Sequence, residues 1–464
     1  MSRLLAALLT LAFLAMNLAW IDRDQLIRDG DEEGHVGAAE LFLDDLRNDR
    51  YADAAAKALY EDMGDYPALY PALVGGWWRA MGGGPPERVT VRGVNLAFLL
   101  LTALGVAGAA RGLGVPDGAA ALGGAVALWL PLNAALSRHF MPEGALCAPV
   151  ALAIWAATRQ SERRGAGAAF TLGLLLAAGV LTKQTFPIYV IAPLVLLLRP
   201  NPTWVWVALG ASAAAPWIYT NLTEQLAYVE LSTTYAVPVP WTTQAAYYPR
   251  SVFEVGLGPV WTVVLAVATV VALRGPHRKA AGVGLVWVLG GLALLTLIPK
   301  KYDRLAAPLL PGAGLVLAAA VATRPRAAWV ALPGVAWTAW TSWVDSPWNH
   351  PSDPIADFHP GCVQRWLRPP FPYPSGFEVV AAAARTNPYG AVRVWAAPEI
   401  PCAIQTTFGW GQHLGPYLRR VGLDRPVYVD DAPAAQGPAT VEVDFRVDEG
   451  ERLEWLDATF AVRP

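Results

Sequence analysis

Apolar residues run along most of this chain in long blocks that are separated by short polar segments. A helix needs roughly 20 apolar residues to cross the hydrocarbon core of a bilayer, and it satisfies its own backbone hydrogen bonds there. The pattern predicts about eleven membrane-spanning helices, at 4–20, 89–110, 118–136, 142–158, 167–183, 185–199, 203–220, 253–273, 280–298, 305–323 and 327–344. The first block, in which Arg3 precedes a short apolar core, could alternatively be a cleaved signal peptide.

Three segments outside these blocks have an ordinary polar composition. Residues 21–88 are expected to form a long first loop, with one helix from Val36 to Leu46 and a second from Pro67 to Met81. The second of these carries two adjacent tryptophans, which suit the membrane interface. Residues 346–375, rich in proline and tryptophan, predict a linker.

The C-terminal segment, residues 376–464, predicts a small α/β domain. Alternating apolar residues between turn signals indicate strands, here near 391–396, 426–430, 439–447 and 458–463, with helices near 376–386 and 410–421. The expected fold class is therefore mainly α: a polytopic helical membrane module over residues 1–345, followed by this domain.

Charge is scarce and unevenly placed. Only 16% of residues are charged and 55% are hydrophobic, whereas a soluble domain carries about 25% charged residues. Neither a basic stripe nor a nucleic-acid-binding motif is present, so no nucleic-acid partner is expected. No internal repeat is visible in the sequence, so nothing favours an inverted-repeat transporter.

The positions of arginine and lysine predict the orientation. If the N-terminus is cytoplasmic, the loops on that side are short and basic, as the positive-inside rule requires. They contain Arg111, Arg159, Arg163, Arg164, Arg199, Arg274, Arg278, Lys279, Arg324 and Arg326. The C-terminal domain then lies outside the cytoplasm, in the periplasm. One loop, 299–304, is basic on the outer side and needs a separate reason.

The three cysteines give little information. Cys147 lies in an apolar block, while Cys362 and Cys402 lie in the C-terminal segment. A disulfide between the latter two is possible outside the cytoplasm, and two unpaired buried thiols are an equal alternative. The sequence contains no cysteine or histidine spacing typical of a metal site, so metal dependence is left open.

Two acidic positions are candidates for chemistry. Asp31, Glu32 and His35 follow the first apolar block directly, within a segment that also contains Asp29 and Glu33. An acid there can serve as a general base, or it can simply favour a helix N-terminus. Glu143 follows Pro142 at the expected outer end of the fourth span; it is either functional or an acid that reaches the water.

Cations gather at the same predicted face. Lys183 ends the fifth span, and the basic outer loop holds Lys300, Lys301 and Arg304. Cations on the translocated side suggest an anionic ligand such as a lipid phosphate. The alternative is that the lysine side chains simply extend to the aqueous phase. Together, an acid that activates a nucleophile and cations that neutralise a phosphate leaving group would make a transfer site.

In these motifs the chain resembles the GT-C membrane glycosyltransferases, in particular the group of protein O-mannosyltransferases and lipid A aminoarabinose transferases. The resemblance covers most of residues 1–345. It rests on five elements in order: Asp31-Glu32 with His35, Tyr66 to Pro71, Arg138 to Glu143, Leu181 to Lys183, and Lys301 to Pro311. The chain departs from the family pattern at His35, where tyrosine is frequent, in the extra acid Glu33, and in the Lys-Tyr-Asp-Arg order.

The resemblance implies an inverting hexosyl- or pentosyltransferase of the bacterial inner membrane. It would move a sugar from a polyprenyl-phosphate donor to a lipid, glycan or protein acceptor on the periplasmic side. Carried over by motif, Asp31 would be the catalytic base supported by Glu32, and Glu143 a second acid that organises acceptor, donor or a divalent ion. Lys183, Lys300, Lys301 and Arg304 would bind the donor phosphate. Substrate would be contacted by His35, Tyr66, Tyr70, Arg138 and His139.

Two other classes compete with this hypothesis. A transporter or lipid flippase with a periplasmic domain should place ionisable residues within its spans, yet these spans contain almost none. A membrane assembly protein would need no acid at Asp31. The sugar, the acceptor, the role of the C-terminal domain and the oligomeric state are not determined by the sequence.

Overall fold

The computed structural model describes two compact units of the chain. The described residues are 2–24, 30–61, 66–83, 89–163, 165–198, 202–234, 240–298, 301–344, 370, 381–382, 385, 392–396, 422–423, 427–429, 441–446 and 459–463. One unit comprises Met1–Asp22, His35–Phe358 and Arg365–Pro369. The other comprises Arg23–Gly34, His359–Gln364 and Pro370–Pro464.

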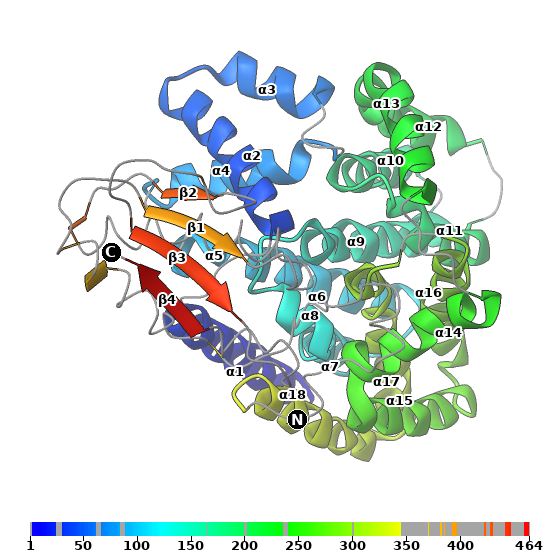
Figure 1. Ribbon diagram of the computed structural model, residues 1–464. Coiled ribbons are helices and arrows are strands. Elements are labelled where there is room, and N and C mark those ends of the chain that lie inside the picture. The colour runs from blue at the N-terminus through cyan, green and yellow to red at the C-terminus, as the bar shows by residue number, and fades with distance from the viewer. Residues whose placement is uncertain are drawn as a thin grey trace. The chain divides into compact units, whose positions relative to one another are not determined.

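The first unit is a bundle of helices (Figure 1). The longer helices are α1 (Ser2–Arg23), α2 (Gly30–Arg47), α3 (Tyr51–Tyr60), α4 (Leu69–Ala80), α6 (Val94–Gly112), α7 (Asp117–Leu128), α9 (Pro142–Arg163), α10 (Ala166–Thr182), α11 (Phe186–Leu197), α12 (Trp204–Ala211), α13 (Ala215–Thr234), α14 (Trp241–Ser251), α15 (Gly258–Leu273), α16 (Arg278–Thr296), α17 (Gly312–Thr323) and α18 (Ala331–Thr341). Short helical segments are α5 (Val89–Arg92), α8 (Pro131–Leu136), η1 (Ser212–Ala214), η2 (Val252–Leu257), η3 (Asp303–Leu309) and η4 (Pro325–Val330).

Every apolar block expected to span the membrane contains helix. Five described stretches are long and apolar enough to cross a bilayer: Ser2–Arg23, Thr90–Gly112, Trp241–Leu273, Arg278–Thr296 and Asp303–Thr323. The chain is therefore a multi-pass membrane protein, while the number of eleven crossings stays a prediction. Several blocks are broken by proline; for example, Pro131 begins α8 after α7 has ended at Leu128.

Helices α6, α7, α9 and α17 form the centre of the bundle. In the stretch Asp303–Thr323, which comprises η3 and α17, 94% of the most apolar part is buried inside the protein. Glycines let α7 and α17 approach closely, because a Cβ on Gly123 would lie 2.4 Å from the carbonyl oxygen of Gly314, and one on Gly314 would lie 2.6 Å from that of Gly123. Such small-residue contacts are typical of helix packing in membranes.

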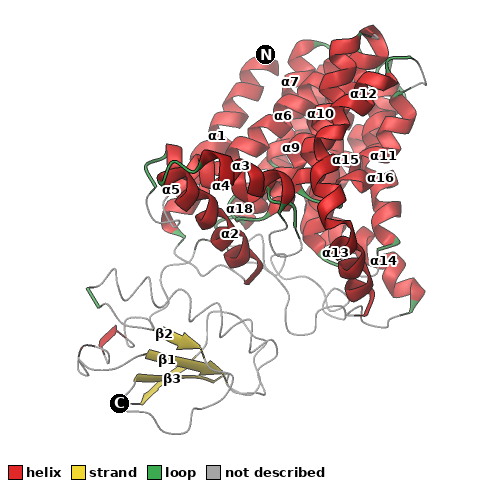
Figure 2. Cartoon of the chain, turned by 90° about the horizontal axis from the view of Figure 1, so that it is seen from above, coloured by secondary structure: helices red, strands yellow, loops and turns green. Residues whose placement is uncertain are grey.

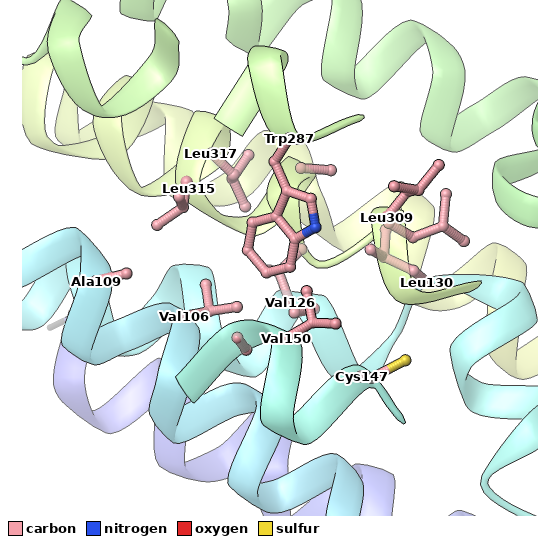
Figure 3. Close-up of a cluster of buried hydrophobic side chains, with 14 of the residues drawn as sticks. Val106, Ala109, Val126, Leu130, Cys147, Val150, Trp287, Leu309, Leu315 and Leu317 are labelled. Carbon is pink, nitrogen blue, oxygen red and sulfur yellow. The ribbon is translucent and has the colours of Figure 1, made fainter. Parts of the chain in front are cut away.

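A tryptophan fills the space beside this centre. The Trp287 indole of α16 lies among aliphatic side chains of α6, α7, α9 and α17 (Figure 3). Its Nε1 donates a hydrogen bond to the carbonyl oxygen of Pro308 at 3.0 Å. The ring thereby ties α16 to η3, the segment that leads into α17, because a buried indole N–H needs an acceptor.

The outer faces of several helices are apolar. Leu4, Leu8 and Leu11 of α1 are exposed along one side of that helix, as are Val195 of α11 and Val263 of α15. A soluble protein rarely exposes this much contiguous apolar surface. These faces suit contact with lipid chains.

The second unit contains a four-stranded sheet (Figure 2). Its strands are β1 (Val392–Ala396), β2 (Val427–Val429), β3 (Val441–Arg446) and β4 (Thr459–Arg463), in the order β2-β1-β3-β4. β1 is parallel to both β2 and β3, while β3 is antiparallel to β4. All four strands lie where the alternation of apolar residues predicted them.

Other expectations for the C-terminal part fall outside the described residues. Helix is found at 381–382 and 385, inside the stretch expected to be helical at 376–386. The helix expected near 410–421, most of the linker 346–375, and both Cys362 and Cys402 are not among the described residues. The domain boundaries and the possible disulfide therefore stay predictions.

Candidate functional site

Glu143 is the buried centre of the candidate site. Pro142 begins α9, and Glu143 occupies the first helical turn with no exposed side-chain surface. A proline at this position lacks the N–H that the helix could not use, and a carboxylate in the first turn is stabilised by the helix dipole. The sequence Met-Pro-Glu thus places a charge inside the bundle at the start of a helix.

Two cations bind the same oxygen of this carboxylate. Lys183 Nζ donates to Glu143 Oε1 at 2.7 Å, and Arg304 Nε donates to Glu143 Oε1 at 3.0 Å. Lys183 directly follows the end of α10, and Arg304 lies in η3. Both side chains are almost fully buried. Three separate elements therefore meet in one ion cluster, and breaking a buried cluster of this kind is costly.

Glu143 has a second oxygen that the cluster does not use. Oε2 is buried, and no described residue offers it a hydrogen bond. Buried polar atoms in native proteins almost always have a partner, so an exception needs an explanation such as a bound water, ion or ligand group. Oε2 therefore marks a position where a polar group of another molecule would be accepted.

The predicted aromatic residues lie against this cluster. Lys183 Nζ lies 4.7 Å from the centre of the Tyr66 ring, a cation–π distance. The His35 ring lies 5.2 Å from that of Tyr66 and 5.8 Å from that of Tyr70, and the Tyr70 hydroxyl contacts the side-chain amide of Asn95 at 3.3 Å. The structure thus brings together His35, Tyr66 and Tyr70 beside Lys183. His35 comes from α2, whereas Tyr66 and Tyr70 come from the start of α4 and the turn before it.

Lys301 has a different environment from Lys183. Its ammonium donates to the carbonyl oxygens of Thr296 at 2.8 Å and Leu295 at 3.3 Å, and also to that of Ile298. These carbonyls end α16, where a cation suits the helix dipole. Burial lowers the pKa of Lys301 to about 8, so the side chain is still mostly protonated at neutral pH. The geometry gives Lys301 a capping role; binding of the donor phosphate stays a prediction.

This geometry explains why the loop before η3 is basic. Lys301 is held by the end of α16, and Arg304 is paired with Glu143 and lies 4.5 Å from the centre of the Tyr302 ring. Two of the three cations that make up the apparent exception to the positive-inside pattern therefore have internal partners. Lys300 lies outside the described residues.

Arg138 and His139 join helices. Arg138 Nε donates to Asn17 Oδ1 at 2.5 Å and Nη2 donates to Ser342 Oγ at 2.8 Å, which connects α1 with the end of α18. The guanidinium also lies 4.7 Å from the Trp20 ring, and the carbonyl of His139 accepts a hydrogen bond from the Asn95 side chain. These contacts are structural, and the expected contact of either residue with substrate stays a prediction.

The acidic pair after the first helix is only partly described. Asp31 and Glu32 lie in α2 and belong to the second unit, whereas Glu143 belongs to the first. Glu32 is buried, with 4% of its surface exposed, and the side chain of Asp31 is outside the described residues. Their expected proximity to Glu143 therefore stays a prediction.

Two buried tyrosines near Glu143 were not expected from the sequence. The hydroxyls of Tyr189 in α11 and Tyr248 in α14 lie close enough to Glu143 to interact with it electrostatically. The Tyr189 hydroxyl lies beside the side chain of Thr185, and the Tyr248 hydroxyl lies beside the backbone of Tyr302. The signal that could have indicated them is the presence of polar side chains inside apolar blocks, which are expensive in a membrane and tend to be functional.

Nothing in the described residues provides a metal centre. No group of three or more His, Cys, Asp or Glu side chains lies close enough together there to hold an ion. Glu143 is already engaged by two cations.

The fold is similar to that of solved ArnT structures, in line with the GT-C resemblance drawn from the sequence motifs. Two similar solved structures are of ArnT from Cupriavidus metallidurans. In the apo state, it shares 13% identity over 91% of this chain and 85% of its own, with a TM-score of 0.55. Bound to undecaprenyl phosphate, it shares 13% identity over 95% of this chain and 92% of its own, with a TM-score of 0.57. Neither a family model nor a curated protein matches the sequence. At this identity the likeness concerns the fold.

Proposed function

We propose that the protein is an inverting glycosyltransferase that moves a sugar from a polyprenyl-phosphate donor to an envelope acceptor. The observation that carries the proposal is the buried cluster in which Glu143 holds Lys183 and Arg304 beside the Tyr66 ring. Support also comes from the similar fold of an ArnT structure that contains undecaprenyl phosphate.

Lys183 is the residue best placed to bind the donor phosphate. Its ammonium has three N–H groups, and it makes one hydrogen bond, to Glu143, together with the contact to the Tyr66 ring. N–H groups remain for phosphate oxygens. Because Glu143 fixes the positions of both cations before any ligand arrives, little reorganisation is needed on binding.

The proposed reaction uses this placement. The acceptor hydroxyl or amine attacks the anomeric carbon from the face opposite the phosphate, and a carboxylate takes its proton. The bond between the anomeric carbon and the phosphate oxygen breaks, and the polyprenyl phosphate leaves with the electron pair. Lys183 and Arg304 stabilise the negative charge that grows on the phosphate. We assign the proton transfer to Asp31, supported by Glu32, as the family pattern implies.

The proposed topology places this chemistry in the periplasm. The N-terminus would be cytoplasmic, residues 21–88 would form the first periplasmic loop, and residues 376–464 a periplasmic domain after the linker 346–375. The basic loops expected on the cytoplasmic side support this orientation. Hexosyl or pentosyl transfer, and a lipid, glycan or protein acceptor, are equally compatible with the site.

A transporter or flippase is the alternative. Such a protein would need ionisable groups along a path through the bilayer. Glu143, Lys183 and Arg304 instead sit at the first turn of α9, the end of α10 and the segment before α17. Charges at helix ends favour chemistry near one membrane face.

The test uses the full chain in proteoliposomes with polyprenyl-phosphate sugar lipids extracted from the membranes of the host. We expect release of free polyprenyl phosphate and transfer of sugar to an added envelope fraction. Asp31→Asn should abolish both while leaving folding intact, and Glu61→Gln, at an exposed position, should retain both. Movement of the lipid across the bilayer without cleavage, unaffected by Asp31→Asn, would support the flippase instead.

A further inference from the structure

A cavity lies at the opposite end of α17 from Glu143. The segment η3, with Arg304, precedes α17, and Thr323 ends it. Around that C-terminal end, residues of α15, α17 and η4 line an open cavity of about 490 Å³. Its lining residues are Val267, Ala268, Val271, Leu317, Thr323, Arg324, Pro325, Arg326, Ala327 and Val330.

The cavity has an apolar part and a cationic part. Val267 and Val271 of α15, Leu317 of α17 and Val330 of η4 supply aliphatic walls. Leu317 lies six residues before Thr323, which corresponds to roughly 9 Å along a helix. The cavity therefore runs from the basic end of α17 toward the middle of the bundle.

Two arginines at the end of α17 are available to a ligand. Arg324 and Arg326 are both exposed. No carboxylate of a described residue lies within salt-bridge distance of either guanidinium. Trp329, three residues further on, is 51% exposed, as is usual for tryptophan at the level of lipid head groups.

The same rim carries further positive charge. Arg274, Arg278 and Lys279, which are exposed, lie in or beside the turn between α15 and α16. This turn packs against the end of α17, since a Cβ on Gly275 would lie 2.0 Å from Thr323 Oγ1. The surroundings of the cavity are therefore cationic, which favours an anionic occupant over a zwitterionic one.

We propose that this cavity binds an anionic phospholipid of the leaflet on that side, the cytoplasmic one in our topology. Its phosphate contacts Arg324 and Arg326, and one acyl chain lies along Val267, Val271, Leu317 and Val330. Guanidinium groups match phosphate oxygens in geometry and charge. The volume falls in the range of about 300–1,000 Å³ found for ligand pockets. The site is independent of the proposed transfer reaction.

The experiment compares phosphatidylglycerol with phosphatidylcholine of identical acyl chains. The full chain in detergent is titrated with each lipid, and bound lipid is measured by native mass spectrometry and by the shift in Tm. Arg324→Gln combined with Arg326→Gln should weaken binding of phosphatidylglycerol by roughly tenfold or more, given the contribution of an arginine at an anionic membrane surface. Arg274→Gln with Arg278→Gln is the matched control, because it removes the same charge from the same rim but from outside the cavity.

Two further arms separate a lipid from a simple anion. Val330→Trp fills the apolar part while it leaves both arginines in place, and it should also reduce binding of phosphatidylglycerol. Inorganic phosphate should not compete at millimolar concentration, because it lacks the acyl chain. An equal loss in the control variant, no loss in the Arg324/Arg326 variant, unchanged binding in Val330→Trp, or full competition by phosphate would each overturn the proposal.

Discussion

Arg304 Nε lies 3.0 Å from Glu143 Oε1, although 161 positions separate the two residues in the chain. Lys183 reaches the same oxygen from a third element. The carboxylate thus connects α9, the end of α10 and η3, and it also sets the spacing of two cations. A change at Glu143 should therefore alter both the stability of the bundle and the binding of an anionic donor.

Glu143→Ala should lower the free energy of unfolding by about 3–5 kcal/mol, because it leaves two buried cations without their counter-charge. The measurement is chemical denaturation in detergent micelles, followed by tryptophan fluorescence. Glu61→Ala removes a carboxylate from an exposed position and should change the same quantity by less than about 0.5 kcal/mol. Equal effects of the two substitutions would show that the ion cluster contributes nothing to the free energy of unfolding.

Arg304 and Lys301 should respond differently to the loss of their charge. Arg304→Gln should lower kcat/KM for the polyprenyl-phosphate donor by roughly 10²-fold, a typical cost of removing one preorganised donor group that stabilises charge in the transition state. Lys301→Met should instead lower Tm with a small effect on kcat/KM, because its ammonium caps carbonyl oxygens at the end of α16. Initial rates measured as a function of donor concentration, together with Tm, distinguish the effect on catalysis from the effect on stability in each variant. A large fall in kcat/KM for Lys301→Met at unchanged Tm would contradict the capping role.

Part of this site could be read from the sequence and part could not. Glu143, Lys183 and Arg304 were indicated by their places at the ends of apolar blocks, because a charge there is unusual. Their meeting at one face was expected, whereas their direct pairing as ions was not, since the acid and the cations were expected to have separate tasks. Periodicity reports the face of one helix; it carries no information on which helix end meets which other end 161 positions later.

Asp45 gives a pH dependence that can be tested. It lies in α2 and accepts hydrogen bonds from Lys57 of α3 and from Arg50. The hydrogen bond from Lys57 lowers the pKa of Asp45 below its usual value and outweighs the opposing effect of burial. The folded state therefore binds this proton less readily than the unfolded state, so the stabilisation is present above about pH 4 and is lost as the pH falls through the folded pKa.

Asp45→Asn should accordingly reduce stability at pH 7 by on the order of 1 kcal/mol. The variant should also show a weaker dependence of Tm on pH between about pH 5 and 3. Thermal unfolding recorded across this range, at low salt, is the measurement. Asp53→Asn, in the same part of the chain but without a resolved ion pair to a described residue, is the control. Parallel curves of Tm against pH for the Asp45 variant and the unchanged protein would contradict the expectation.

The contact between α7 and α17 predicts an unequal response of two glycines to the same change. Gly314→Ala would place a Cβ 2.6 Å from the carbonyl oxygen of Gly123 and should destabilise the bundle by about 1–3 kcal/mol. Gly282→Ala in α16 meets no atom within 4 Å and should be neutral or slightly stabilising, by up to about 1 kcal/mol. The measurement is chemical denaturation of both variants under identical conditions. Equal free energies of unfolding for the two variants would rule out a tight contact.

The secondary structure, too, was predicted in part from the sequence pattern. The four strands appeared at the residues where apolar alternation predicted them, because a half-buried strand requires that alternation. The block at 118–136, in contrast, was expected to be one helix and is two, since Pro131 starts a new helix after Leu128. A hydropathy average over the block does not detect such a break, because all of its residues are apolar. The break itself is caused by the steric restrictions of proline.

The paired glycines also have a consequence for biogenesis. Gly314 follows Gly123 by 191 positions, so the face of α7 that receives α17 is complete long before its partner has been synthesised. At roughly 5–20 residues per second, the ribosome takes on the order of 10–40 s to supply α17. Throughout that interval α7 must be sheltered by the insertion machinery or by lipid, and the final closure of the bundle is a late, post-insertion event.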